Sequence, residues 1–236
     1  LGCGYTAWRR VWARSGRYVT PFRDRADAGR LLAKQVAALG LESPVILALP
    51  RGGVPVAAEV AAELSAPMDV FVARKVGAPG HEEFGIGAVA EGLDEVVLSR
   101  GAGQLRIPRK EFEHLATRAQ RELARRVALY RGDRALPEIA ARDVVLVDDG
   151  AATGVTAEAA LRSLRLREPN KLILAVPVCA QGAANRLGAL ADKIVCLHAA
   201  VQFLAVGQWY QNFSQTTDDE VLDLLARAHA EESWWT

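Results

Sequence analysis

Two adjacent carboxylates, Asp148 and Asp149, directly follow an apolar run at residues 144–147, and a loop of small residues then leads into a helical pattern. The apolar run is typical of a buried parallel strand, and open α/β sheets bind ligands at the carboxyl ends of such strands. Unpaired N–H groups at the helix start, beside the hydroxyls of Thr153 and Thr156, would cradle a phosphate. The carboxylates would accept hydrogen bonds from sugar hydroxyls or hold Mg²⁺, directly or through water. Together these groups describe a site for a ribose 5-phosphate.

A second loop combines a basic residue with two glycines. Arg51, Gly52 and Gly53 follow the apolar run at residues 45–49. Glycines directly after a strand favour a tight turn.

Apolar runs of strand length alternate with helical patterns from residue 22 onward. A helical spacing over residues 28–39 stops at Gly40, and an alanine-rich helix is expected to end at about Leu64. The strand-like runs lie at residues 45–49, 68–73, 144–147, 172–178 and 194–197. Strands that are apolar on both faces and are separated by helices form parallel sheets covered on both sides. We therefore predict an α/β fold with a doubly wound, mostly parallel sheet.

This alternation breaks at an insertion of about residues 77–142. Residues 77–83 predict a loop, residues 84–90 and 96–98 predict antiparallel strands, and a long helix is expected from Pro108. One face of that helix is apolar, with Phe112, Leu115, Ala119, Leu123, Val127 and Tyr130. The other is basic, because residues 106–134 hold nine Lys and Arg against four Asp and Glu, a net charge of about +5. Both a solvated face and a binding surface fit this pattern.

The chain of 236 residues as a whole is nearly neutral, since 29 Lys and Arg against 28 Asp and Glu give a formal charge of +1. This balance argues against bulk electrostatic binding to nucleic acid or to an anionic membrane. No apolar run is long enough to cross a bilayer. The three cysteines form no CxxC, so we expect neither a disulfide framework nor a zinc site, and we expect a reducing, cytoplasmic location.

The two ends of the chain are expected to lie outside the main domain, which we place at residues 21–230. Residues 1–20 carry four arginines and no acid, and they predict either an extension outside the fold or a basic arm that touches a partner. Residues 217–220 form a capping-box pattern that predicts the start of a final helix, and residues 231–236 form a tail.

The acid-pair segment resembles the phosphoribosyl-diphosphate (PRPP) binding signature of the type I phosphoribosyltransferases. Residues 49–55, with Arg-Gly-Gly, look like the pyrophosphate loop of that family, and residues 72–81 are similar to its Arg-Lys segment and the mobile loop that follows. More precisely, the chain resembles a branch in which Arg-Lys-x-Gly-Ala-Pro-Gly, Val-Asp-Asp-Gly-x-Ala-Thr-Gly and Val-Gly-x-Trp-Tyr recur, and the resemblance covers about residues 22–230. It implies the type I fold, with the insertion and a small hood at about residues 198–216.

The resemblance also implies the reaction, in which a nucleobase nitrogen displaces Mg²⁺-pyrophosphate from C1 of PRPP in nucleotide salvage. Asp148 and Asp149 would hold the ribose, and Arg74 and Lys75 would stabilise charge on the departing pyrophosphate. The residues implied to bind PRPP are Arg51, Gly52, Gly53, Asp148, Asp149, Gly150, Ala151, Ala152, Thr153, Gly154 and Thr156. His81 and Glu82 would belong to the mobile loop, although Ala78 and Pro79 stand where relatives have a basic residue. We expect a homodimer.

The base is the least defined part of the resemblance. Ala152 stands where hypoxanthine-guanine relatives carry an Asp that contacts purine N7, so that position supplies no general base. Residues 203–213 look like the hood segment of the same enzymes, which favours a purine and suggests Phe203 and Trp209 as base contacts. Aromatic residues at this spacing also fit a hydrophobic core.

An alternative to an enzyme is a non-catalytic PRPP-binding regulator on the same fold. Regulators in this superfamily bind DNA or RNA, and the basic helix at residues 118–131 is the candidate surface for that. A third possibility is a domain cut from a longer fused protein.

Overall fold

The computed structural model describes residues 11–12, 18–19, 21–79, 81–99 and 107–232, and it describes side chains at residues 21–79, 85–99 and 107–230. A short antiparallel pair, β1 (Val11–Trp12) and β2 (Tyr18–Val19), forms a sheet of its own. No helix in the described part of the chain is long and apolar enough to span a membrane.

The core of the fold is a five-stranded sheet in the order β10-β9-β8-β3-β4, and each neighbouring pair is parallel. Its strands are β3 (Val45–Ala48), β4 (Met68–Val70), β8 (Asp143–Val147), β9 (Lys171–Ala180) and β10 (Lys193–Ala200). These strands coincide with the five apolar runs of the sequence. The prediction of a mostly parallel sheet is confirmed.

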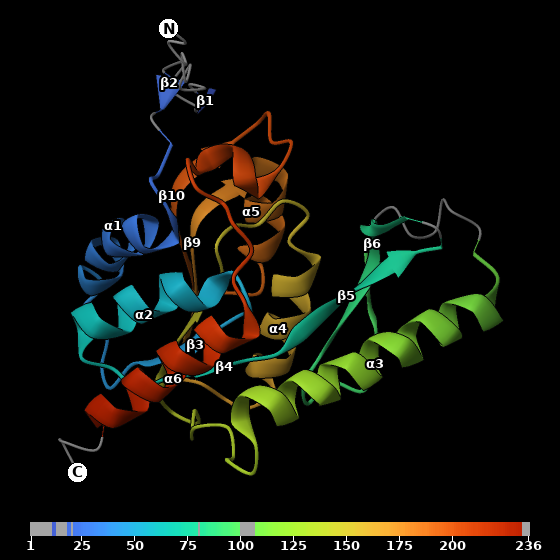
Figure 1. The fold of residues 1–236 in the computed structure, drawn as a ribbon, viewed down its shortest axis with the longest axis horizontal. Helices are drawn as coiled ribbons and strands as arrows, with labels where there is room; N and C mark the ends of the chain where they lie inside the picture. Colours follow the sequence, from blue (N-terminus) through green and yellow to red (C-terminus); the bar gives the residue numbers. More distant parts are fainter. Residues whose placement is uncertain (1–10, 13–17, 20, 80, 100–106, 233–236) are drawn as a thin grey trace, which may run out of the picture.

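Helices and a second sheet cover the two faces of this central sheet (Figure 1). Alternate strand residues pack to opposite sides: Ile46 faces one core cluster and Leu47 the other. The first cluster includes residues of α1 (Arg25–Ala37), α2 (Gly53–Leu64) and α6 (Asp218–Glu232). The second includes residues of α4 (Val155–Arg165), α5 (Gln181–Leu187) and the antiparallel sheet. The arrangement is the predicted doubly wound one.

The insertion forms an arm made of a three-stranded antiparallel sheet and a long helix. The sheet runs β5 (Ala73–Ala78), β6 (His81–Ala90), β7 (Val97–Leu98), and the helix is α3 (Arg109–Arg131). The predicted apolar face of α3 packs on β5 and β6, where Phe112 and Leu115 contact a cluster that contains Val76 and Ile86. Figure 1 shows α3 lying along this sheet, to one side of the five-stranded core.

The prediction of a loop at residues 77–83 is wrong. Gly77 pairs with Gly85 and Ala78 pairs with His81, so the ladder continues almost to the tip of a hairpin. Val76 and Ala78, two positions apart on one face of the strand, are both buried. Their burial stabilises the strand despite the neighbouring glycines. His81 and Glu82, which we predicted in a mobile loop, begin strand β6, and their side chains lie outside those described.

The capping box at the start of α6 is confirmed. The backbone N–H of Thr217 donates to Glu220 Oε2 at 2.7 Å, and the N–H of Glu220 donates to Thr217 Oγ1 at 3.1 Å. These two bonds satisfy donors that a helix start leaves unpaired.

Candidate functional site

The loops after β3 and β8 lie side by side because these strands are parallel neighbours, with Ala48 opposite Val147. A Cβ on Gly52 would lie 2.0 Å from Asp149 Oδ2, and a Cβ on Gly53 would lie 2.7 Å from the Val147 carbonyl oxygen. A side chain at position 53 would therefore clash with backbone, and one at position 52 would require the Asp149 carboxylate to move. The structure brings together the two loops that the sequence singled out, and the peptide bond between Pro50 and Arg51 in the first loop is cis.

The acid pair is crowded and only partly compensated by positive charge. Burial raises the pKa of Asp148 well above its usual range, and the nearby charge of Asp149 raises it further. Burial also raises the pKa of Asp149, although Arg25 acts in the opposite direction, with its Nε 2.7 Å from Asp149 Oδ2. Perturbed carboxylates at a strand end are a common feature of functional sites.

Arg25 is a site residue that sequence reasoning missed. It is the first residue of α1, its Nη1 donates to the Ser214 carbonyl at 2.7 Å, and its guanidinium lies 4.0 Å from the centroid of the Phe213 ring. Its partner Asp149 is 124 residues away, so no local pattern joins the two. The one available signal was an arginine in the first turn of a helix, where the helix dipole disfavours positive charge.

The loop after the acid pair is held on both sides before it enters α4. Ala151 donates to the Val178 carbonyl and accepts from Ala180 N–H, both at 2.9 Å, so β9 fixes the middle of the loop. Gly154 adopts a left-handed conformation with φ of 70°, and no described side chain caps the N-terminus of α4. The first N–H groups of α4 therefore have no capping side chain in the part of the chain that the structure describes. Such groups are the ones that bind phosphate.

The remaining predicted residues of this loop take different places. Ala152 and Thr153 are exposed, and Thr156 lies in the first turn of α4. Gly150 sits under the hood, where a Cβ would lie 2.6 Å from Val206 Cγ1. Arg51, predicted to bind PRPP, directs its guanidinium to the start of α6, with Nη1 3.7 Å from Asp218 Oδ1.

Arg74 and Lys75 lie on opposite faces of β5. Side chains alternate along a strand, and Ala73 belongs to the cluster shared with α4 whereas Val76 packs on α3. The aliphatic part of the Lys75 side chain accordingly lies close to Gly85, since a Cβ built on Gly85 would be 2.7 Å from Lys75 Cδ. The same Cβ would be 3.6 Å from Val155 Cγ1 at the start of α4. Lys75 therefore shares a face with the loop that leads into α4, and Arg74 faces α3.

Trp209 of the hood, which we suggested as a base contact, is buried in the structure. Its ring is 1% exposed and lies between His198 and Phe203, with ring centroids 5.8 and 6.0 Å away. Trp209 is thus a core residue in this structure, as the alternative interpretation of the aromatic spacing holds, because its faces are covered by other rings. Phe203 is only partly buried.

Tyr210 is a second residue that the sequence analysis missed. Its hydroxyl donates to the backbone carbonyl of Asp149 at 2.6 Å, which ties the hood to the acid pair. Burial, and next the charge of Asp149, raise the pKa of Tyr210 well above its usual range, so the phenol keeps its proton. The neighbouring Val-Gly-x-Trp-Tyr motif was visible in the sequence, but its contact with Asp149 requires the fold.

The two carboxylates fit a metal ion that is held mainly by a substrate. The described residues contain no group of three His, Cys, Asp or Glu side chains that could hold a metal. Mg²⁺ is commonly bound through one or two carboxylates together with substrate phosphates and water. Asp148 and Asp149 are therefore compatible with Mg²⁺ that arrives with a diphosphate.

Comparisons with known proteins identify the family. The model of the phosphoribosyl transferase domain family matches residues 23–206. Two curated Mycobacterium tuberculosis proteins, named “Putative phosphoribosyl transferase MT0597” and “Putative phosphoribosyl transferase Rv0571c”, are 43% identical to this chain over 208 residues, which is 88% of this chain and 47% of each relative. The chain thus spans about half the length of these relatives. The crystal structure of TT1426 from Thermus thermophilus shares 45% identity and a TM-score of 0.70, and it covers 88% of this chain and 98% of that one. As the acid-pair motif predicted, the chain belongs to the phosphoribosyl transferase domain family.

Proposed function

We propose that this protein is an Mg²⁺-dependent enzyme that transfers the ribose 5-phosphate of PRPP to a ring nitrogen of a nucleobase and releases pyrophosphate. The observation that carries the proposal is the packing of Gly52 and Gly53 directly against Asp149 and Asp148 at two neighbouring strand ends. This contact supports the proposal, because it brings a loop whose backbone N–H groups could bind an anion next to two carboxylates that could bind ribose hydroxyls. A purine is the favoured base.

Each part of the site has a separate task in the proposed reaction. Asp148 and Asp149 accept hydrogen bonds from the ribose hydroxyls, and the uncapped N–H groups of α4 hold the 5-phosphate. The base nitrogen bonds to C1 as the bond from C1 to the diphosphate oxygen breaks, and the diphosphate leaves with the bonding electrons. The N–H proton that the base loses passes to solvent water. Lys75, on the α4 side of β5, would stabilise that growing negative charge. Mg²⁺, when bound, would neutralise part of the diphosphate charge.

Turnover with a panel of bases tests this proposal. The protein is mixed with PRPP, Mg²⁺ and single purine and pyrimidine bases, and pyrophosphate release is followed in time. We expect release with at least one base and none with the Asp148→Asn, Asp149→Asn double variant. Absence of release with every base would overturn the enzymatic proposal.

A PRPP-binding regulator is the second candidate, and two observations favour it. The first is that both faces of the Trp209 ring are covered. The second is that Ala152 has no carboxylate, whereas the resemblance implies that hypoxanthine-guanine relatives contact the base through an Asp at this loop position. The regulator hypothesis predicts PRPP binding by calorimetry with no pyrophosphate release. Under either hypothesis we propose a cytoplasmic homodimer, and sedimentation equilibrium measures the oligomeric state.

A further inference from the structure

Arg186 on α5 reaches the loop that leads from the acid pair into α4. Its Nη2 donates to the backbone carbonyl of Thr153, and its Nε lies 3.2 Å from Glu158 Oε2 on α4. Arg162 holds the other carboxylate oxygen of Glu158, with Nη2 3.0 Å from Oε1. The three charged side chains therefore form a connected set that ends on a carbonyl of the loop.

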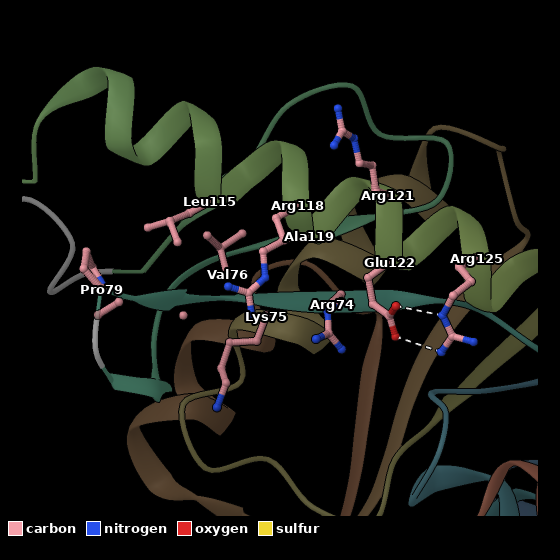
Figure 2. Close-up of a pocket in the computed structure, with 12 residues that line it drawn as sticks. Arg74, Lys75, Val76, Pro79, Leu115, Arg118, Ala119, Arg121, Glu122 and Arg125 are labelled. Carbon is pink, nitrogen blue, oxygen red and sulfur yellow. Dashed lines mark hydrogen bonds and ion pairs between the residues drawn. The ribbon is translucent and has the colours of Figure 1, made fainter.

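A comparison with α3 shows what distinguishes this arrangement. Figure 2 shows Arg125 paired with Glu122, and both residues lie on α3, where such a pair supports its own helix. Arg186 instead joins α5 to α4 and donates in addition to Thr153, which lies before the first residue of α4. The bond to Thr153 lies outside both helices, so its effect falls on the loop.

The next residue of the loop, Gly154, packs closely against α5. A Cβ at this position would be 2.9 Å from Leu187 Cδ1 and 3.3 Å from Ala183 Cβ, and the φ of 70° lies in the left-handed region. Glycine adopts several backbone conformations at little cost, so Gly154 does not by itself fix the orientation of the peptide that precedes it. The contact from Arg186 supplies that restraint.

The bond from Arg186 also sets the direction of an N–H group. In a planar trans peptide, the C=O of one residue and the N–H of the next point in opposite directions. Because the Thr153 carbonyl points to Arg186, the Gly154 N–H points away from it. Among the described residues, the N–H groups of Gly154, Val155 and Thr156 donate to no acceptor. These donors are therefore available to an anion at the start of α4.

We propose that Arg186 is a positioning residue for the 5-phosphate of PRPP, because it holds the peptide between Thr153 and Gly154 with the Gly154 N–H turned toward the phosphate. This inference rests on the proposed function for the identity of the ligand, and Arg186 itself does not touch the phosphate. Without Arg186 the peptide would populate both orientations, and the affinity for the phosphate would fall in proportion to the competent fraction.

Calorimetric titration of the Arg186→Gln variant with two separate ligands tests this proposal. Ribose 5-phosphate carries only the phosphate that the start of α4 would bind, whereas pyrophosphate with Mg²⁺ would bind at the loop of Gly52 and Gly53. We expect the variant to bind ribose 5-phosphate about tenfold more weakly, and pyrophosphate within about twofold of the unmodified protein.

Arg165→Gln is the matched control. Arg165 lies in the last turn of α4, and its Nη2 is 3.0 Å from both the Leu190 carbonyl oxygen and Asp192 Oδ2. It makes the same two kinds of contact as Arg186, to a backbone carbonyl and to a carboxylate, at the far end of the helix. We expect Arg165→Gln to keep the unmodified affinity for both ligands.

A second measurement follows Gly154 directly. In proton–nitrogen correlation spectra, the Gly154 amide proton of the unmodified protein should move downfield when ribose 5-phosphate is added, since a hydrogen bond to an anion deshields the proton. The same ligand should move it less in the Arg186→Gln variant, because the N–H then points toward the phosphate in only part of the molecules.

Four outcomes would overturn the inference. They are no binding of ribose 5-phosphate by the unmodified protein, equal affinity for it in the Arg186→Gln and Arg165→Gln variants, an equal loss of both ligands in Arg186→Gln, and a Gly154 amide that ribose 5-phosphate does not move. Turnover separates this inference from the proposed function. If the unmodified protein binds ribose 5-phosphate as expected but releases no pyrophosphate with any base, the enzymatic proposal fails and the role of Arg186 stands. If it turns over and Arg186→Gln leaves the KM for PRPP unchanged, the role of Arg186 fails and the enzymatic proposal stands.

Discussion

An acid stands at each end of strand β8, Asp143 at its start and Asp148 just after its end, and the two carboxylates differ in the number of hydrogen bonds that they accept. At the amino end, Asp143 is 0% exposed and accepts hydrogen bonds from Glu42 N–H at 2.9 Å, Asn170 Nδ2 at 2.7 Å and Lys171 Nζ at 3.2 Å. Burial by itself would raise the pKa of Asp143, but these three donors outweigh it and hold the pKa below its usual value.

At the carboxyl end, Asp148 has almost none of this support. Among the described residues its carboxylate accepts one hydrogen bond, from the N–H of Asp149 at 2.9 Å. Burial and the adjacent acid therefore keep its pKa raised. A buried acid with a full set of donors stabilises the fold, whereas a partly buried acid that accepts few hydrogen bonds can still accept them from a ligand, as we propose for Asp148.

The largest expected effect is at the amino end. Asp143→Ala should lower the free energy of unfolding by about 3 kcal/mol, because it removes a fully buried carboxylate that accepts three hydrogen bonds, one of them from the charged Lys171. Urea unfolding followed by circular dichroism measures the change. Asp94→Ala, at an exposed position, is the control and should stay within about 0.5 kcal/mol.

The pH dependence of the same variant sharpens the comparison. Because the pKa of Asp143 is lowered in the folded state, its contribution is present above the unfolded value of about 3.9 and is lost as pH falls through the lower folded value. The gap between Asp143→Ala and the unmodified protein should therefore shrink in acid. A gap that grew as the pH fell would contradict the assignment of Asp143 as an ionised structural acid.

At the carboxyl end, Gly52→Ala should displace the acid pair. The new Cβ would lie 2.0 Å from Asp149 Oδ2, so the carboxylate must move, and overpacking of this kind costs about 1–3 kcal/mol. We expect PRPP affinity, measured by calorimetry, to fall at least about tenfold. Gly182→Ala is the matched control, since a Cβ there meets no described atom within 4 Å. Equal PRPP affinity in the two variants would remove Gly52 from the site.

Arg25→Gln should have a smaller effect that depends on pH. It removes the guanidinium that lowers the pKa of Asp149, and we expect a loss of about 1–2 kcal/mol in unfolding free energy at pH 8. The loss should decrease as the pH is lowered from 8 to 5, because the raised pKa of Asp149 moves its protonation to higher pH and protonation weakens the ion pair. Arg30→Gln, on the same helix with an exposed ion pair to Glu59, should change stability by less than about 1 kcal/mol at either pH.

The sequence predicted what depends on short-range pattern. Five apolar runs became the five parallel strands, the Thr217 capping box formed, and the acid pair stands at the end of β8. Contacts between distant segments were not predictable. Arg25 reaches Asp149 across 124 residues, and Tyr210 reaches the same residue across 61. The loop predicted at residues 77–83 failed because strand pairing outweighed the local preference of glycine and proline for turns.

The smallest expected effect has the opposite sign to the first. The pKa of Asp148 is higher in the folded state than in the unfolded state, where it is about 3.9. The contribution of Asp148 to stability is therefore fully present below the unfolded pKa and is lost as the pH rises through the folded pKa. Asp148→Asn removes an ionisation that the fold opposes, so at pH 8 the melting temperature of the ligand-free protein should rise by about 2–4 °C while PRPP binding is lost. Near pH 4, where Asp148 is protonated, the two melting temperatures should converge. A lower melting temperature at pH 8 would mean that Asp148, like Asp143, is held by the fold for its own stability, and the contrast between the two ends of β8 would fail.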